Sequence, residues 1–580
     1  MLTRWGRTLD SDAAHPEHPR PQLVRPDWRS LHGVWECAIA PTGERPHVWQ
    51  PIVVPFSPES ELSGVRRQLQ PHETLHYRRE FDLPADFPGS HRVVLHLDAV
   101  DQRCHVRVNG TPVGRGECGY LPVDCDITHA VRRHGNTLEV TVTDPSETGQ
   151  GMRGKQRLER GGIWYTATSG IWQPVWIEAV PDPAIQHVEA TTVRVDDGWG
   201  LDVRVDPDGS ARSTTPVRVE VLADNTVVAE GSAVLSGRVR IPLPDPRWWS
   251  PTDPFLYDLR VTLGEDQVTS YAALRTVGID RDAAGTPRLT LNGEPFLHTG
   301  VLDQGYWPDG LLTPPSDAAM VADIETVKRL GFTTIRKHVT VEPRRWYHHC
   351  DRLGVLVWQD LPNGGGPYVG RAIDGRNRVP ERPRRLHGRA DAPGRARFEE
   401  HAEEIVRQLR CVPSIVLWTV FNEGWGQFDT VQVGALVSRA DPTRPVVHAS
   451  GWHDRGGGDV ATHHEYLSEW RMPERAEGDD RVHALGEYGG VGLPVPGHTW
   501  GDAPWGYADA ISSTDLTDRL VRMLREQVAP SVPAGLSAVI WTQLTDVEDE
   551  HNGLLTWDRE VLKVDEAAVR DALTAVHREL

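Results

Sequence analysis

Residues 415–423 read Ile-Val-Leu-Trp-Thr-Val-Phe-Asn-Glu, an apolar run that ends in an amide and a carboxylate and is followed by Gly-Trp-Gly. Similar apolar runs recur after residue 278, at 296–301, 333–338, 355–360, 446–450, 461–466, 483–489 and 536–542. Amphipathic stretches lie between several of them, for example at 317–330, 396–411 and 515–528. Strands that alternate with helices in this way predict a (β/α)8 barrel, a TIM barrel, over residues 278–580. Only the helix between runs 446–450 and 461–466 is weakly indicated, because Gly456-Gly-Gly has little helical propensity.

The chain before residue 278 alternates with period two, which is typical of half-buried strands. From 28 to 181 the strands are short, and Asn109-Gly110 after His105-Val-Arg-Val is the signal of a tight hairpin. This part is predicted to be a jelly-roll β-sandwich of the sugar-binding type. After Pro181-Asp-Pro, residues 182–277 alternate again and predict an immunoglobulin-like β-sandwich. Residues 1–27 are polar and rich in Pro and His, and we interpret them as an extended lead-in.

The charge balance of 62 basic against 82 acidic residues gives a net charge of −20. Such a chain repels phosphate backbones and anionic membranes, which argues against nucleic acid and membrane partners. No run of about 20 apolar residues would span a bilayer. The first residues lack the apolar core of a signal peptide, and the six cysteines are scattered. We therefore expect a cytoplasmic protein with free thiols; it could form a homo-oligomer.

Two of the apolar runs end in glutamates, Glu423 and Glu487. In a (β/α)8 barrel the carboxyl ends of the strands form the active site, so both side chains are expected there. A pair of carboxyl groups, one protonated and one ionised, is the equipment of a glycosidase. The close negative neighbour raises the pKa of the acid and so divides the two roles. The alternative is that either glutamate forms a salt bridge to a barrel arginine.

Several motifs together resemble glycoside hydrolase family 2, the family of β-galactosidases, β-glucuronidases and β-mannosidases. The resemblance covers residues 28–580 and follows the family's order of domains. It rests on Arg247-Trp-Trp-Ser-Pro with Pro254-Phe-Leu-Tyr, Gly331-Phe-Thr-Thr-Ile-Arg-Lys-His, Cys350-Asp-Arg-Leu-Gly-Val-Leu-Val-Trp-Gln-Asp, Trp418-Thr-Val-Phe-Asn-Glu and Gly486-Glu-Tyr-Gly.

The resemblance implies a retaining double displacement with Glu487 as the nucleophile and Glu423 as the acid/base. It further implies that Asn422 binds the sugar 2-hydroxyl, that Tyr488 holds Glu487, and that Trp541 is the platform under the sugar ring. Other residues at strand ends are expected to line the pocket; these are Arg336, His338, Asp360, Asp303, His463, His464 and Trp425. No cofactor is required by this chemistry, and no metal ligands are assigned, although Mg²⁺ or Na⁺ would leave no signal in the sequence.

The sequence departs from the family in ways that bear on the sugar. Glucuronidases of this family read the sugar carboxylate with an Asn-x-Lys motif, whereas the corresponding region here, 546–555, is acidic and has no lysine. Leu302-Asp303-Gln-Gly-Tyr-Trp replaces the usual start of the barrel, and Trp425 follows the acid/base. We therefore expect an exo-acting enzyme for neutral sugars, β-galactosidase-like first. The alternatives are a galactofuranosidase or arabinofuranosidase, a β-mannosidase or β-glucuronidase, an inverting hydrolase, and an inactive carbohydrate-binding protein.

Overall fold

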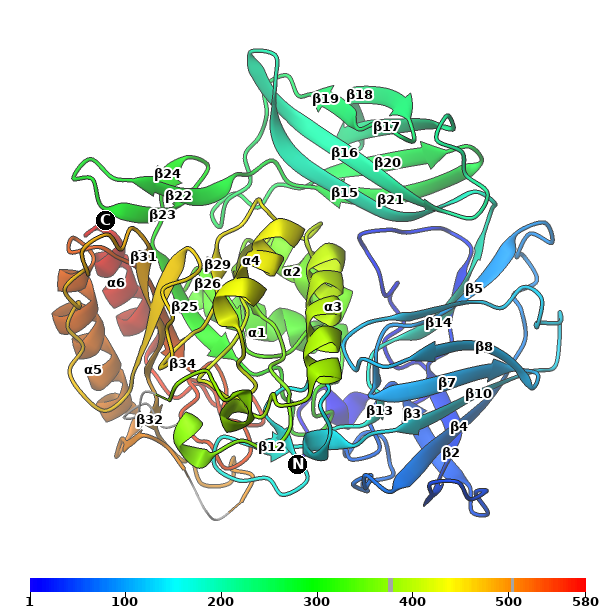
Figure 1. The fold of residues 1–580 in the computed structure, drawn as a ribbon, viewed down its shortest axis with the longest axis horizontal. Helices are drawn as coiled ribbons and strands as arrows, with labels where there is room; N and C mark the ends of the chain where they lie inside the picture. The colour runs from blue at the N-terminus through cyan, green and yellow to red at the C-terminus, as the bar shows by residue number, and fades with distance from the viewer. Residues whose placement is uncertain (374–378, 502–504) are drawn as a thin grey trace.

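The computed structural model describes residues 1–373, 379–501 and 505–580. Figure 1 shows two β-sandwiches beside a barrel whose strands are surrounded by helices. The first sandwich, in blue, lies at the side of the barrel, and the second, in green, lies above it. No helix within the described ranges is both long and apolar enough to cross a membrane.

The first sandwich packs a six-stranded sheet, in the order β3-β2-β4-β10-β7-β8, against a four-stranded sheet, β1-β14-β5-β9. The alternating residues of these strands bury one face each, and the buried faces share one hydrophobic core. Asn109 and Gly110, with φ of 51° and 77°, join β7 to β8, which confirms the predicted hairpin. The strands are β1 (Trp28–Ser30), β2 (Gly33–Pro41), β3 (Gln50–Val54), β4 (Glu73–Phe81), β5 (Arg92–Leu97), β6 (Val100–Asp101), β7 (Arg103–Val108), β8 (Thr111–Gly116), β9 (Val123–Asp126), β10 (Asn136–Thr143), β11 (Gln156–Arg157), β12 (Tyr165–Thr166), β13 (Gly170–Ile171) and β14 (Val175–Val180).

The second sandwich has a three-stranded sheet, β15-β16-β19, facing a four-stranded sheet, β18-β17-β20-β21. Valine and leucine side chains of both sheets form its separate core. Its strands are β15 (Ala184–Val195), β16 (Gly198–Asp208), β17 (Pro216–Ala223), β18 (Thr226–Val234), β19 (Val239–Pro242), β20 (Tyr257–Leu263) and β21 (Asp266–Ala272). The alternation seen between 184 and 277 therefore corresponds to an immunoglobulin-like sandwich.

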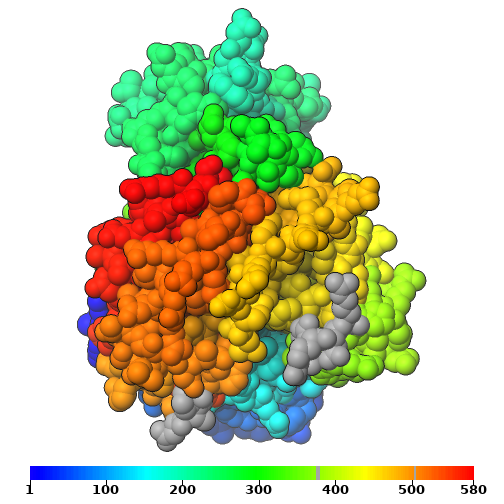
Figure 2. All heavy atoms as spheres, turned by 90° about the vertical axis from the view of Figure 1, so that its left-hand side faces the viewer, coloured from blue at the N-terminus to red at the C-terminus, as the bar shows by residue number. Residues whose placement is uncertain are grey.

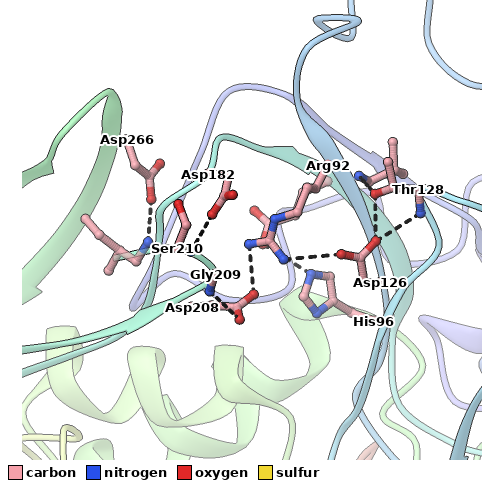
Figure 3. Close-up of polar contacts among 12 residues, drawn as sticks. Arg92, His96, Asp126, Thr128, Asp182, Asp208, Gly209, Ser210 and Asp266 are labelled. Carbon is pink, nitrogen blue, oxygen red and sulfur yellow. Dashed lines mark hydrogen bonds and ion pairs between the residues drawn. The ribbon is translucent and has the colours of Figure 1, made fainter. Parts of the chain in front are cut away.

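Polar contacts hold the two sandwiches together (Figure 3). Arg92 of the first sandwich donates to Asp126 of its own sheet at 3.3 Å and to Asp208 of the second sandwich at 2.9 Å. Within the second sandwich, Asp266 accepts the backbone N–H of Ile185 at 2.6 Å. The two sandwiches are thus joined by groups from strand ends and turns, away from both hydrophobic cores.

The N-terminal 27 residues cross all three parts of the molecule. Thr3 donates to the carboxylate of Asp309 in the barrel, with its hydroxyl at 2.7 Å. Val24 pairs with Thr269 of β21 as an isolated bridge. The buried Arg25 binds Glu178 of the first sandwich and Asp266 of the second. The predicted lead-in is therefore an interdomain strap, because its polar groups find partners on each part in turn.

His96 contributes a pH-dependent part of the stability of the first sandwich. Burial alone would lower the pKa of His96, but Asp124 and Glu178 face its two ring nitrogens and raise the pKa to about 9. A raised pKa stabilises the fold fully below pH 6.5, and that contribution is lost as the pH rises through 9. We expect His96→Gln to lower the free energy of unfolding by about 3 kcal/mol at pH 6 and by much less at pH 9.5.

Urea unfolding of wild type and variant at both pH values measures this effect. His105→Gln is the control, because the ring of His105 is exposed on β7. An effect of His96→Gln that stays constant between pH 6 and 9.5 would exclude a protonated His96 as the source of the stability.

The barrel consists of eight parallel strands in the order β29-β28-β27-β26-β25-β34-β31-β30. Each predicted apolar run overlaps one of them. The strands are β25 (His298–Asp303), β26 (Thr334–Lys337), β27 (Leu356–Asp360), β28 (Ile415–Thr419), β29 (Val446–Val447), β30 (Val460–Glu465), β31 (Val482–Gly489) and β34 (Leu536–Thr542). Among the described residues no ladder joins β29 to β30, so the barrel is nearly closed and has a seam at that point.

Helices cover the outside of the barrel (Figure 1). They are α1 (Asp317–Arg329), α2 (Arg344–Leu353), α3 (Ala392–Leu409), α4 (Thr430–Ala440), α5 (Ser513–Met523) and α6 (Glu566–His577). Ser316, Asp391, Ser512 and Asp565 cap four of them with side-chain oxygens. Irregular chain connects β29 to β30, as the glycine run predicts. The smaller strands β22 (Val277–Arg281), β23 (Pro287–Leu291), β24 (Glu294–Pro295), β32 (Val491–Gly492) and β33 (Ala508–Asp509) lie outside the barrel sheet.

A loop of the first sandwich reaches the barrel at the end where the barrel strands finish. The hydroxyl of Tyr165 donates to Glu550, and the N–H of Thr166 donates to Glu548 at 3.0 Å. Arg160 pairs with Asp549 at 2.8 Å. In Figure 2 cyan atoms of the first sandwich lie directly below the yellow and orange segments of the barrel. The first sandwich therefore contributes to the surroundings of any site at this end.

Candidate active site

Glu423 lies in a tight turn that follows β28. Its φ is 52°, a left-handed conformation that costs a non-glycine residue about 1–3 kcal/mol. The N–H of Glu423 donates to the Ser450 carbonyl at 2.9 Å and fixes the turn. Gly424 follows with a φ of 87°, and a Cβ there would lie 2.3 Å from the Ala372 carbonyl oxygen. The strained turn therefore directs the Glu423 carboxyl toward the barrel axis, and the glycine after it is required.

Glu487 lies within β31, where the pairing register shifts between Leu485 and Tyr488. Its side chain is 2% exposed, and that of Glu423 is 6% exposed. One oxygen of each carboxyl group lies within 4.8 Å of the other. This spacing is typical of retaining glycosidases, because inverting enzymes leave about 6.5–9.5 Å between the two groups.

His464 and Tyr466 lie between the two carboxyl groups. Nδ1 of His464 is 2.9 Å from an oxygen of Glu423 and 3.6 Å from one of Glu487. The hydroxyl of Tyr466 donates to Glu487 at 2.5 Å and lies 3.5 Å from Glu423. Among the described residues, the trio of Glu423, His464 and Glu487 is the only group placed to hold a metal ion. A metal ion there would occupy both glutamates.

Arg336 of β26 connects the polar groups around Glu487. Its guanidinium donates to the side-chain oxygen of Asn422 at 2.8 Å and lies 3.3 Å from Glu487. It also pairs with Asp360 at 3.0 Å. A fully buried arginine is costly unless its donors are satisfied, and these three acceptors satisfy it. Arg336 and Asp360 thus position the site around Glu487.

The charges around Glu487 keep it ionised. Burial alone would raise its pKa, but the basic side chains around it, His464 first and Arg336 and Lys155 with it, hold the pKa well below the usual range. Nδ2 of Asn422 is buried without a partner among the described residues. The arrangement therefore offers an ionised carboxylate, a second carboxyl group close to it and a free amide donor.

Three family descriptions match the chain in succession. Residues 55–172 match the galactose-binding domain-like part of glycosyl hydrolase 2, and residues 183–279 match the middle domain described as glycosyl hydrolases family 2. Residues 287–477 match the TIM barrel domain of glycosyl hydrolases family 2. The chain belongs to glycoside hydrolase family 2. It is therefore a glycoside hydrolase, and the three predicted folds are confirmed.

Solved structures of this family share the whole fold at low sequence identity. The β-D-glucuronidase of Dictyoglomus thermophilum is 18% identical with a TM-score of 0.73, and the match covers 96% of this chain and 98% of that one. A β-galacturonidase from Eisenbergiella tayi bound to galacturonate is 18% identical with a TM-score of 0.71, over 97% and 99% of the two chains. The β-glucuronidase of Ruminococcus gnavus is 17% identical with a TM-score of 0.75, over 94% and 97%.

Tyr488 and Trp541, both expected to serve the family 2 site, pack against each other. The hydroxyl of Tyr488 donates to Gln527 at 2.7 Å, and the Tyr488 ring packs edge to face with Trp541 at 6.2 Å. Both belong to the largest hydrophobic cluster, whereas Ile540, next to Trp541, belongs to a separate cluster inside the barrel. Alternation along β31 explains why the Tyr488 hydroxyl turns from Glu487 to Gln527, because neighbouring residues of a strand face opposite sides. Tyr466 holds Glu487 instead.

Three further expected pocket residues of this glycoside hydrolase have other partners. Trp425 is fully buried against Trp164 of the first sandwich, with ring centroids 5.1 Å apart. His463 lies beside His483, outside the pocket, because the register of β30 shifts before His464. Asp303 pairs with Lys337 at 2.5 Å in a buried ion pair. By contrast, His338 pairs with Asp360 at 2.9 Å and faces the site.

Two side chains of the family 2 site escaped the sequence prediction. Tyr466 ends the sixth apolar run, so its position carried the same signal as that of His464. Lys155 comes from the first sandwich and lies close enough to Glu487 to lower its pKa. No pattern within the barrel would identify a residue from another domain.

Proposed function

We propose that the protein is a retaining exo-β-glycosidase that releases a neutral, galactose-like sugar from the non-reducing end. In this proposal Glu487 attacks the anomeric carbon, and Glu423 first protonates the leaving oxygen and then deprotonates the incoming water. The observation that carries it is the 4.8 Å limit on the spacing of the two carboxyl oxygens, which leaves no room for a water between the Glu487 carboxylate and the anomeric carbon. Asn422, with its free amide donor, suits the sugar 2-hydroxyl.

Two features support exo-action on a neutral sugar. The loop around Tyr165 closes one side of the barrel mouth through Glu548 and Glu550, which favours a pocket over an open groove. Both glutamates are buried in the region where family 2 glucuronidases carry their lysine motif. A uronic acid would bring a further negative charge to this acidic loop, and like charges repel.

A β-uronidase is the second candidate, because the printed titles of the similar structures name glucuronidases and a galacturonidase. Their identities of 17–18% leave the sugar open. A furanoside of galactose or arabinose remains a third possibility, since the first barrel strand and Gly-Trp-Gly after Glu423 depart from the family pattern.

Hydrolysis of nitrophenyl glycosides tests the proposal. We expect kcat/KM for the best neutral β-glycoside to exceed that for the glucuronide and galacturonide by at least about 100-fold, because the acidic loop that carries Glu548 and Glu550 repels a carboxylate. NMR of the first product should show the β-anomer. A first product with the α-configuration would establish inversion, and a lack of activity on every pyranoside and furanoside would favour a carbohydrate-binding protein.

A further inference from the structure

Lys155 is a buried ammonium group whose partners are missing from the described residues. It lies in a loop of the first sandwich, between Gly154 and Gln156, and is 5% exposed. Within the described ranges, its side chain has neither an ion pair within 4.0 Å nor a hydrogen bond. An ammonium that has no partner among the described residues of the site is available to donate hydrogen bonds to a ligand.

Lys155 lines a small cavity beside the catalytic residues. The cavity has a volume of about 10 Å³ and is also lined by His338, Gln304 and Thr340. Nε2 of His338, Nε2 of Gln304 and Oγ1 of Thr340 are buried without a partner among the described residues. This volume suits one oxygen atom with its hydrogen, as in a water or a hydroxyl group.

The protonation of His338 decides which ligand fits. Nδ1 of His338 is 2.9 Å from Asp360, whose pKa is lowered chiefly by Arg336 against the effect of burial, so Nδ1 carries the proton. Burial lowers the pKa of His338, which keeps the ring neutral. Nε2 therefore presents a lone pair to the cavity and accepts a hydrogen bond.

We propose that Lys155 and His338 together bind one hydroxyl group of the terminal sugar. The ammonium donates to the hydroxyl oxygen, and the hydroxyl proton is donated to Nε2 of His338. This inference rests on the proposed function and names how its neutral sugar is recognised. A carboxylate fits poorly, because it has no proton for Nε2 and brings two oxygens into room for one.

The surrounding charges agree with a neutral ligand. Lys155 is the strongest charge that counters the burial of Glu550, whose pKa is nevertheless raised. It also lowers the pKa of Glu487. The ammonium is therefore balanced in the long range by two carboxyl groups of the site, and what it lacks is an oxygen at hydrogen-bond distance. A hydroxyl group supplies that oxygen without adding charge.

Monodeoxy analogues of the best nitrophenyl glycoside, each lacking one hydroxyl, test this with wild type and Lys155→Met. One analogue should lose about 10- to 100-fold in kcat/KM with wild type, the worth of a hydrogen bond to a charged group. Lys155→Met should lose about as much on the parent sugar and show no further loss on that analogue. Arg160→Met is the matched control, because it removes a cation of the same loop that pairs with Asp549. The Arg160→Met enzyme should rank the analogues by kcat/KM in the same order as wild type.

Other outcomes overturn the inference in distinguishable ways. If Lys155→Met lowers kcat/KM equally for every analogue, Lys155 only supports the loop, or the cavity holds a water. If the loss is confined to uronides, Lys155 binds a carboxylate. If wild type hydrolyses no glycoside at all, the proposed function itself fails. Thermal unfolding of each variant confirms that the proteins compared are folded.

Discussion

Glu487→Gly is expected to lower kcat by about 10⁵-fold on every substrate, because the glycosyl-enzyme can no longer form. The loss should be equally large for good and poor leaving groups, since the missing bond is the one made to the anomeric carbon. Initial rates on a nitrophenyl glycoside measure it. Glu465→Ala is the matched control: Glu465 ends β30 beside the site, but its carboxylate accepts the N–H groups of Leu467 and Ser468 and faces away.

Azide identifies the role of Glu487 beyond the loss of activity. In Glu487→Gly the space left by the carboxylate admits azide, which attacks the same face of the sugar and gives an α-glycosyl azide from a β-glycoside. Recovery of activity together with formation of the α-glycosyl azide identifies Glu487 as the nucleophile. If azide gives no recovery, or gives a β-glycosyl azide, Glu487 is not the group that attacks.

Glu423→Ala is expected to lower kcat/KM by about 10³- to 10⁴-fold on alkyl glycosides or disaccharides, because their leaving oxygen must be protonated. For a dinitrophenyl glycoside the first step needs little protonation, so kcat/KM should fall by less than about tenfold. A plot of log kcat/KM against the pKa of the leaving group measures this as a steeper slope than that of wild type.

The same variant should respond to azide with the opposite stereochemistry. Glu487 is intact in Glu423→Ala, so the glycosyl-enzyme forms and azide attacks it without needing a base, which gives a β-glycosyl azide. A uniform loss of activity across all leaving groups, without a response to azide, would show that Glu423 supports the fold or binds substrate and is not the acid/base.

Most of the barrel could be predicted from the sequence because its strands are buried on both faces and read as continuous apolar runs. The run at 415–423 contains β28, and that at 536–542 coincides with β34. The hairpin at Asn109 was predictable because its turn requires positive φ. The path of residues 1–27 across three domains depends on distant partners such as Asp309 and Asp266, which no local pattern reveals.

Only one rule allowed part of the site to be predicted: the carboxyl ends of the barrel strands meet at one edge of the barrel. This rule brings Glu423, Glu487 and Arg336 together. It does not say which of two neighbouring residues faces inward, because that depends on the register shifts in β30 and β31. His463 and Tyr488 were misplaced for this reason. Lys155 was missed because it arrives from another domain.

Between Glu423 and Glu487 the shorter way round the barrel crosses the unpaired edges of β29 and β30. At this point side chains replace the main-chain ladder: Ser450 binds His464 at 2.8 Å, and His464 binds Glu423. The distance on which the stereochemical outcome depends is thus set by a few exchangeable groups. A substitution at these contacts would therefore change the spacing of the two carboxyl groups while every strand of the barrel stays in place.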